Sequence, residues 1–598
     1  MSPASYHKFH IPVMGLAYTI DSPIKVARFG ISSVISIVED RLVEMMRQHY
    51  YPVSGREYQP ISTQEPDHRA RRITDYLNLV NSIVQAQVDK LRNAAFEAGS
   101  EIVKYFEMLP DDSVLKQLYL QMMHTHNPVE KQKIESQLRA QIQPGSIDVN
   151  IMTKVDREIY TADGLVVENG SDAVTALRGY AASDLTNSSV VFSAGMNPRL
   201  YNYLENCEGF DPNEAGMFTK KVIVKVSDYR SALIQGKYLA KKGIWVSEFR
   251  IESGLNCGGH AFATEGYLLG PILEEFNANR QELTNTIFEI YQAALLKKNK
   301  QPLVSPPNIL FSVQGGIGTY DENEFLIRQY QMTTAGWGTP FLLVPEATTV
   351  DADTLNLLCK AKEKDVVLSH NSPLGVRFHY LKNTSSDKEK EQRIRKGNPG
   401  SPCTEKHLSF NTEFTKEPIC TASHKYQKLK IAQLRSLDLP ESEFDQQVSE
   451  VLGKECLCVG LSNAAAIQYN QTFVKTLKAV TICPGPNIVH FSKVVSLKTM
   501  TDHIYGRTNI LANSHRPHMF IAELHLYIDY LKEEIGKDNR TGDFHKRKKY
   551  YTSFCQNLIN GIHYYRNLFN QTHPEQFGKA LDHAMVEIET LNYQYSLL

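Results

Sequence analysis

The sequence predicts an α/β fold, namely a (β/α)8 TIM barrel with a helical insertion after strand 2 and a mostly helical C-terminal region. Residues 1–350 alternate short β-branched or apolar runs with segments that can form helices. Several of these runs are almost continuously apolar, as parallel strands covered on both faces are. The stretch between the second and third runs, 39–146, is too long for an ordinary connection and therefore predicts an insertion.

Eight strands are predicted, which is the number that closes such a barrel. Segments such as 228–242 and 321–331 can form the helices between them. The predicted strands are residues 11–18, 30–38, 147–154, 188–195, 221–228, 243–249, 308–316 and 331–338.

Three regions follow from this pattern. Residues 1–40 and 145–360 form the predicted barrel, 41–144 the helical insertion (an excursion or a lid), and 361–598 a largely helical C-terminal region, here called the tail. The tail carries apolar stretches that need burial, and we expect it to pack over the active-site mouth of the barrel. Within the tail, residues 382–402 predict a solvated loop, because they are first charged and then rich in Gly and Pro. Amphipathic helices are predicted at 518–536, 543–569 and 574–594.

Composition limits the function classes. The net charge is −1 and the pI is about 7.0, which argues against bulk binding to nucleic acid or anionic membranes. No apolar run reaches the roughly 18 residues of a membrane span, and no secretory signal is recognisable. The nine cysteines are an odd number spread thinly, as in a reducing compartment. A cytoplasmic location is therefore expected.

Glycine-rich segments follow the last three predicted strands. They are "GLNCGGHAF" (254–262), "QGGIGT" (314–319) and "GWGTPF" (336–341). At the carboxyl ends of barrel strands, such turns leave backbone N–H groups free to hold an anion, and the loops after strands 7 and 8 form the usual phosphate site. The first segment adds His260, whose side chain changes charge near neutral pH.

Together with "IPVMGLA" and "IDVNI" earlier in the chain, these segments resemble the nitronate monooxygenase family, which includes 2-nitropropane dioxygenases and flavin-type enoyl-acyl-carrier-protein reductases. The resemblance implies an FMN-binding barrel in which His260 is the catalytic or flavin-side histidine. It places the phosphate at the glycine turns, Asn150 near the isoalloxazine, and Met14 and Gly15 beside the ring. The cofactor-binding candidates are Met14, Gly15, Asn150, Lys225, Gly258, Gly259, Gln314, Gly315, Gly316, Gly338 and Thr339.

The substrate is left open. Asn256 and Cys257 stand where the family usually has a glutamate-alanine pair, and both nitronate oxidation and enoyl-thioester reduction have precedents. Cys257 is a second catalytic candidate that could touch flavin or substrate, although a buried inert thiol explains it as well. The substrate would be a small activated molecule or an acyl thioester, with NAD(P)H as a candidate electron donor and an acyl carrier protein as a candidate partner. The alternative is a flavin-binding accessory protein without turnover.

Five cysteines in the tail raise a separate question, because gathered thiolates can hold zinc or an iron–sulfur cluster. Their spacing is irregular and contains no C-x-x-C pair, so ordinary buried thiols are the simpler reading and no metal ligand is assigned. Three histidines of the same region are predicted to be surface or core residues. These residues are Cys403, Cys420, Cys456, Cys458 and Cys483, with His370, His379 and His407.

Overall fold

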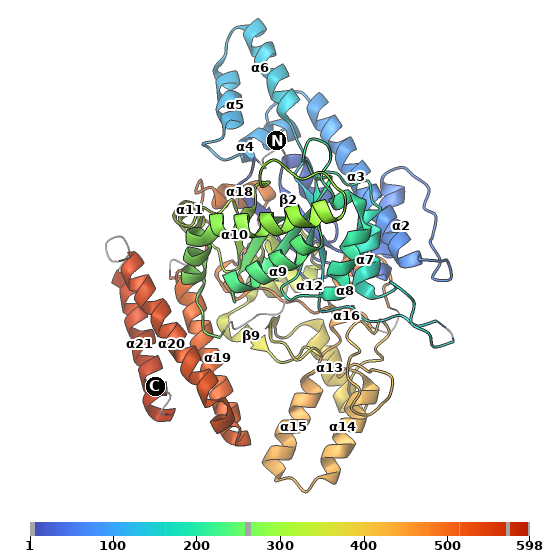
Figure 1. Ribbon diagram of the computed structural model, residues 1–598, viewed down its shortest axis with the longest axis vertical. Coiled ribbons are helices and arrows are strands. Elements are labelled where there is room, and N and C mark those ends of the chain that lie inside the picture. The colour runs from blue at the N-terminus through green and yellow to red at the C-terminus, as the bar shows by residue number, and fades with distance from the viewer. Residues whose placement is uncertain are drawn as a thin grey trace.

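The computed structural model describes residues 6–161, 163–257, 265–474, 477–512, 515–569 and 575–595. Eight parallel strands form a closed barrel in sequential order, which confirms the predicted fold class (Figure 1). The barrel strands are β1 (Phe9–Ile11), β2 (Ser32–Ser36), β3 (Ile147–Ile151), β4 (Ser188–Phe192), β5 (Lys220–Val226), β6 (Val246–Glu252), β7 (Leu310–Gln314) and β8 (Thr334–Gly336).

Helices surround the barrel and make up most of the tail. Before the tail they are α1 (Ser22–Val26), α2 (Asp40–Val53), α3 (His68–Asn93), α4 (Glu101–Met108), α5 (Val114–His124), α6 (Pro128–Gln141), α7 (Asp172–Ala181), α8 (Pro198–Tyr203), α9 (Tyr229–Lys241), α10 (Leu269–Lys297), α11 (Tyr320–Gln329) and α12 (Ala352–Lys360). In the tail they are α13 (Ser385–Arg395), α14 (His424–Ser436), α15 (Glu441–Gly453), α16 (Leu457–Gly460), α17 (Asn463–Gln468), α18 (Leu497–Ile504), α19 (Met519–Thr541), α20 (Phe544–Phe569) and α21 (Glu575–Tyr595).

All eight strands differ from their predicted bounds by some residues, and β1 and β6 differ most. β1 ends at Ile11, because Pro12 has no N–H for the ladder and Gly15 turns the chain with a φ of +57°. β6 runs three residues beyond its predicted end, to Glu252. Its charged residues alternate with Phe249 and Ile251, so they face the barrel interior while the apolar residues face the surrounding helices.

The insertion is an excursion rather than a lid over the mouth. Its helix α3 packs against α2 and α7, and α4 packs beside residues 27–29, which precede β2. The Tyr105 hydroxyl contacts the Gln143 carbonyl near the amino ends of the strands. In Figure 1, α5 and α6 lie at the opposite end of the molecule from α14 and α15 of the tail, whereas the tail helix α18 packs against α4. This insertion therefore supports the side and the amino end of the barrel.

The tail lies over the carboxyl ends of the strands, as predicted. The Ala17 amide, after β1, donates to the Leu461 carbonyl at 3.0 Å. His379 contacts the Gly254 carbonyl after β6 at 2.9 Å. Asn487 donates to the Ile317 carbonyl after β7 at 3.0 Å. These bonds bring the tail onto loops from widely separated strands.

The predicted loop at 382–402 is wrong over most of its length, because α13 occupies Ser385–Arg395. Thr384 caps this helix by accepting a hydrogen bond from the Asp387 amide. Lys390 pairs with the buried Glu455 at 3.4 Å. Charge alone therefore suggested a loop, whereas the cap and this pairing stabilise a helix. The tail also holds a two-stranded antiparallel sheet, β9 (Val366–Ser369) and β10 (Phe378–Leu381).

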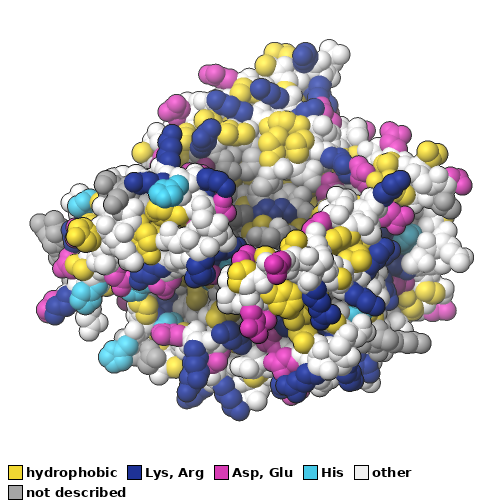
Figure 2. Space-filling view, turned by 90° about the horizontal axis from the view of Figure 1, so that it is seen from below, with side chains coloured by type: hydrophobic (Ala, Val, Ile, Leu, Met, Phe, Trp, Pro, Cys, Tyr) yellow, Lys and Arg dark blue, Asp and Glu magenta, His cyan; other side chains and the backbone are white. Residues whose placement is uncertain are grey.

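The face seen in Figure 2, from below, is hollowed near its centre and mixes Lys and Arg with Asp and Glu. This mixture agrees with the near-zero net charge. Among the described residues, no helix combines the length and the apolar character that crossing a membrane would require.

A buried histidine fastens the tail to the barrel. His407 lies between two carboxylates, with its Nε2 at 2.6 Å from Glu39 and its Nδ1 at 3.2 Å from Asp172. Glu39 follows β2, and Asp172 opens α7. Burial alone would lower the pKa of His407, but the two carboxylates raise it to about 10. A buried cation with two anionic partners thus joins three segments.

We predict that His407→Gln destabilises the protein by roughly 3 kcal/mol at pH 6, because it leaves the buried Glu39 without its paired cation, whereas Asp172 keeps Arg69. The free energy of unfolding that the wild type gains over the variant is fully present below about pH 6.5, the pKa of histidine in the unfolded chain. This gain is lost as the pH rises through about 10, the pKa of His407 in the folded protein. Thermal unfolding of both proteins between pH 6 and 10 measures it. The control is His525→Gln, on the exposed face of α19. A pH-independent difference would contradict the ion-pair account.

Candidate active site at the carboxyl end of the barrel

Inward-facing polar side chains meet at the carboxyl ends of β5, β6 and β7. Glu252 accepts hydrogen bonds from Lys225 at 3.0 Å and from Gln314 at 2.8 Å. Asn256, in the loop after β6, also donates to Glu252 and accepts from Gln314 at 3.2 Å. The side chains of Lys225 and Glu252 are only 8% and 9% exposed, so each neutralises a charge that would otherwise be costly to bury.

Three buried polar atoms at this end of the barrel have no hydrogen-bond partner among the described residues. They are Asn150 Oδ1 on β3, Gln314 Oε1 on β7 and Ser36 Oγ on β2. Ser36 is paired with Asn150 in the parallel ladder. An unsatisfied buried acceptor costs about 1–3 kcal/mol, so these atoms suit a ligand or water that donates to them.

The glycine turn after β7 has the backbone geometry that the sequence suggested. Gly315 and Gly316 have φ values of +108° and +82°, which side chains rarely adopt. Their amide N–H groups, and those of Gly338 and Thr339 after β8, donate to no other described residue. The space beside Gly316 is filled by Leu255, since a Cβ there would lie 2.5 Å from Leu255 Cδ1.

A buried arginine of the tail binds the glycine turn after β7. Arg516 donates to the Gly316 carbonyl at 2.6 Å and pairs with Glu322 at 2.6 Å. Its side chain is 5% exposed. The tail residue Gly485 packs against Thr339, where a Cβ would lie 2.4 Å from the Thr339 hydroxyl. Arg516 was not among the predicted site residues, because it lies in a segment without a motif.

Cys257 is buried between the loops after β6 and β8. Its thiol lies 3.6 Å from the carbonyl of the tail residue Cys483. A Cβ on Gly338 would lie 3.2 Å from Cys257 and 3.6 Å from Met14 Sδ. Gly15, next in the chain, lies near Leu461 of the tail. Burial raises the pKa of the Cys257 thiol to about 11, so it stays protonated at neutral pH.

Gly258, Gly259 and His260 lie outside the described residues. The two ends of their loop are described, and both are bound by one tail carboxylate. Glu523 on α19 accepts from the Gly254 amide at 3.3 Å and from the Leu269 amide at 2.8 Å. Burial raises the pKa of Glu523 to about 7. The tail thus fixes where this loop leaves and rejoins the barrel.

Lys154 is a second residue that the sequence analysis missed. It follows β3, and its side chain lies within 3.4 Å of a Cβ built on Gly195 after β4. Burial lowers the pKa of Lys154 to about 8, against the attraction of Glu252. A lysine with this pKa can exchange a proton near neutral pH. Its position at the very end of a predicted strand was the signal that could have revealed it.

Only some of the five tail cysteines lie near one another. Cys403 and Cys420 are hydrogen-bonded neighbours, and the charge of Cys403 also acts on Cys458. Within the described ranges, no three His, Cys, Asp or Glu side chains are grouped so that they could hold a metal ion. All described cysteines are free thiols.

No protein-family model and no curated protein matches this sequence. Among solved structures, the chain is similar to the enoyl reductase domain of MlnA from the macrolactin biosynthesis cluster of Bacillus amyloliquefaciens. The two share 12% sequence identity with a TM-score of 0.33, over 70% of this chain and 93% of that chain. A likeness this low carries no inference about function.

We predict that Glu252→Gln lowers the free energy of unfolding by roughly 3 kcal/mol, because Lys225 then keeps a buried charge without an anion. Chemical denaturation at neutral pH measures the change. The matched control is Glu391→Gln, which breaks the exposed Glu391–Arg395 pair at 3.4 Å and costs less than about 1 kcal/mol. Equal losses in both variants would mean that Lys225 does not depend on this carboxylate.

Proposed function

We propose that the protein is an FMN-dependent oxidoreductase that acts at the carboxyl end of the barrel on a small activated substrate or an acyl thioester. One observation carries the proposal. Asn150 and Gln314 hold buried oxygen atoms without a described partner, beside the Lys225–Glu252 pair and at the end of a closed barrel. Active sites of this fold form at that end.

The residues present fit this cofactor. The flavin pyrimidine edge carries an N–H donor and carbonyl acceptors, for which the Asn150 and Gln314 oxygens and the Lys225 ammonium are suitable partners. The glycine turns after β7 and β8 offer backbone amides for a phosphate. The positive φ values of Gly315 and Gly316 strongly favour glycine at these two positions. Arg516 adds a buried cation beside this turn.

FMN, when bound, would exchange a hydride or single electrons with the substrate. The chain's own residues would hold the substrate, exclude water and move a proton. His260 is the proposed donor of the proton to the substrate carbon, and Lys154, with a pKa of about 8, is a second group that can hold a proton near the mouth. The tail, which lies over the loops at the carboxyl ends of the strands, would exclude water from the mouth. NAD(P)H as electron donor and an acyl carrier protein as partner are part of the proposal.

Colour and cofactor content test it most directly. Purified protein should be yellow and release FMN on denaturation. Reduction of the bound flavin by NADPH or NADH, followed by oxidation with an enoyl thioester or a nitronate, would identify the reaction class. A flavin-loaded protein that turns over neither substrate would favour the alternative, an accessory protein without turnover. A colourless protein that takes up no added FMN would contradict the proposal.

We predict that Asn150→Leu weakens FMN binding by about tenfold, the loss of one buried hydrogen bond, while the melting temperature of the apoprotein stays equal or rises. The rise is expected because the change removes a buried acceptor without a partner. The control is Ser33→Ala. Its buried hydroxyl also lacks a described partner but lies on the other face of β2, so this change should leave FMN affinity intact. Equal FMN affinities in both variants would remove Asn150 from the site.

We also predict that His260→Gln retains FMN and lowers turnover roughly 100-fold, the usual effect of losing a general acid or base. The amides that we propose for the phosphate lie on other loops, which is why the cofactor should stay bound. Flavin content, melting temperature and the two half-reactions are measured on one preparation. A fully loaded variant with an unchanged substrate half-reaction would exclude His260 from proton transfer.

A further inference from the structure

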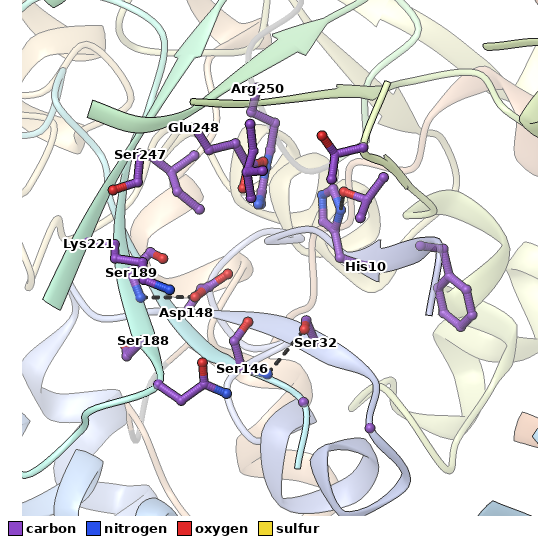
Figure 3. A pocket seen from close by; sticks show the side chains of 18 of the residues that line it. His10, Ser32, Ser146, Asp148, Ser188, Ser189, Lys221, Ser247, Glu248 and Arg250 are labelled. Carbon is purple, nitrogen blue, oxygen red and sulfur yellow. Dashed lines mark hydrogen bonds and ion pairs between the residues drawn. The ribbon is translucent and has the colours of Figure 1, made fainter. Parts of the chain in front are cut away.

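A polar cavity lies at the opposite, amino end of the barrel (Figure 3). Its volume is about 140 Å³, and residues at or before the amino ends of all eight strands line it. The interior of such barrels is usually filled with branched apolar side chains. Here the lining includes charged residues and five serines, namely Asp148, Lys221, Glu248 and Arg250, with Ser32, Ser146, Ser188, Ser189 and Ser247.

Arg250 is a buried cation whose hydrogen bonds are incomplete. It is 3% exposed, and its Nε donates to Glu248 at 2.9 Å. In the part of the chain that the structure describes, its two terminal nitrogens make no hydrogen bond. Ser312 donates to the same Glu248 oxygen, so that oxygen is already shared between two donors. The outer edge of the guanidinium is therefore left for a partner with two acceptor atoms.

Asp148 is the opposite group across the cavity. It is 4% exposed and accepts one hydrogen bond, from the Ser189 amide at 3.0 Å. Arg250 attracts Asp148, but no ion pair joins the two within the described chain. Figure 3 shows Arg250, Glu248, His10 and Asp148 converging on one space. A molecule that bridges this space must offer acceptors to Arg250 and a donor to Asp148.

The charges of the lining decide between classes of ligand. Arg250 and Lys221 balance Asp148 and Glu248, and burial lowers the pKa of His10 so that this ring is neutral. A simple anion would leave Asp148 facing a negative charge, and a simple cation would face Arg250. A zwitterion adds no net charge and matches both groups. The serine hydroxyls at the rim suit a small polar molecule.

We propose that this amino-end cavity binds a small zwitterionic α-amino acid, with its carboxylate on the outer edge of Arg250 and its ammonium on Asp148. The proposal does not depend on flavin chemistry at the other end of the barrel. Isothermal titration of the full chain with three probes of similar size tests it. L-alanine carries both charges, lactate has a hydroxyl in place of the ammonium, and ethylamine lacks the carboxylate.

L-alanine should bind, and lactate and ethylamine should bind at least tenfold more weakly, because each leaves one buried charge without its partner. Arg250→Lys keeps the charge but loses the planar fork, and should weaken L-alanine binding at least tenfold. Ser146→Phe, at the rim, should block entry without touching the ion pairs. Ser136→Phe, the same change on an exposed position of α6, should bind as the wild type does.

Three results would overturn the proposal. One is no binding of L-alanine at millimolar concentration. Another is equal affinity for lactate and L-alanine, which would remove Asp148 from the site. The third is unchanged L-alanine binding in Ser146→Phe, provided that this variant melts at the wild-type temperature. If Arg250→Lys does not fold, Ser146→Phe and the three probes still decide the question.

Discussion

The charges that β6 carries into the barrel constrain the rest of the structure. Glu248, Arg250 and Glu252 all face inward from one strand, because their spacing is two residues. If these three buried charges had no partners, they would unfold the barrel, since each unpaired buried charge costs several kcal/mol. Lys225 from β5 neutralises Glu252, and Glu248 binds Arg250 on its own strand. Both polar ends of the interior are organised by this one strand.

The same need for partners explains how the tail is attached. Apolar contacts alone would leave the position of the tail on the barrel poorly defined, because they have no preferred direction. Buried ionic contacts have a fixed geometry and therefore define that position. His407 between Glu39 and Asp172, and Arg516 on Glu322, join tail segments to the connections that follow three different strands, β2, β3 and β7. Glu523 adds hydrogen bonds to both ends of the loop after β6. The tail is therefore part of the barrel's carboxyl end.

The fold could be predicted from the sequence because it depends on patterns that single segments carry. The apolar runs of β3, β4 and β7 are strands in any context that covers both faces. The cofactor-binding candidates on β3, β5 and β7, namely Asn150, Lys225 and Gln314, do lie at one end of one barrel. The partners of these residues could not be predicted, because Glu252 is in a part of β6 that was not read as strand. His407 and Arg516 lie far away in the sequence, and only the folded tail brings them to the mouth.

A small apolar cluster lies between the two polar ends on one side of the barrel interior only. Val13, Val34, Val191 and Ile223 form a core of their own, distinct from the main core between barrel and helices. Close-packed valine and isoleucine side chains leave little room for water or for a ligand to pass. On the other side the two ends meet through polar groups, because His10 of the amino-end cavity lies beside Gln314: a Cβ built on Gly336 would lie 3.0 Å from His10 Nε2 and 3.3 Å from Gln314 Oε1. A barrel filled throughout with apolar layers would be easier to stabilise, and this cost is the physical reason that our proposals place ligands at the buried acceptors of Asn150 and Gln314 and at the incompletely bonded Arg250.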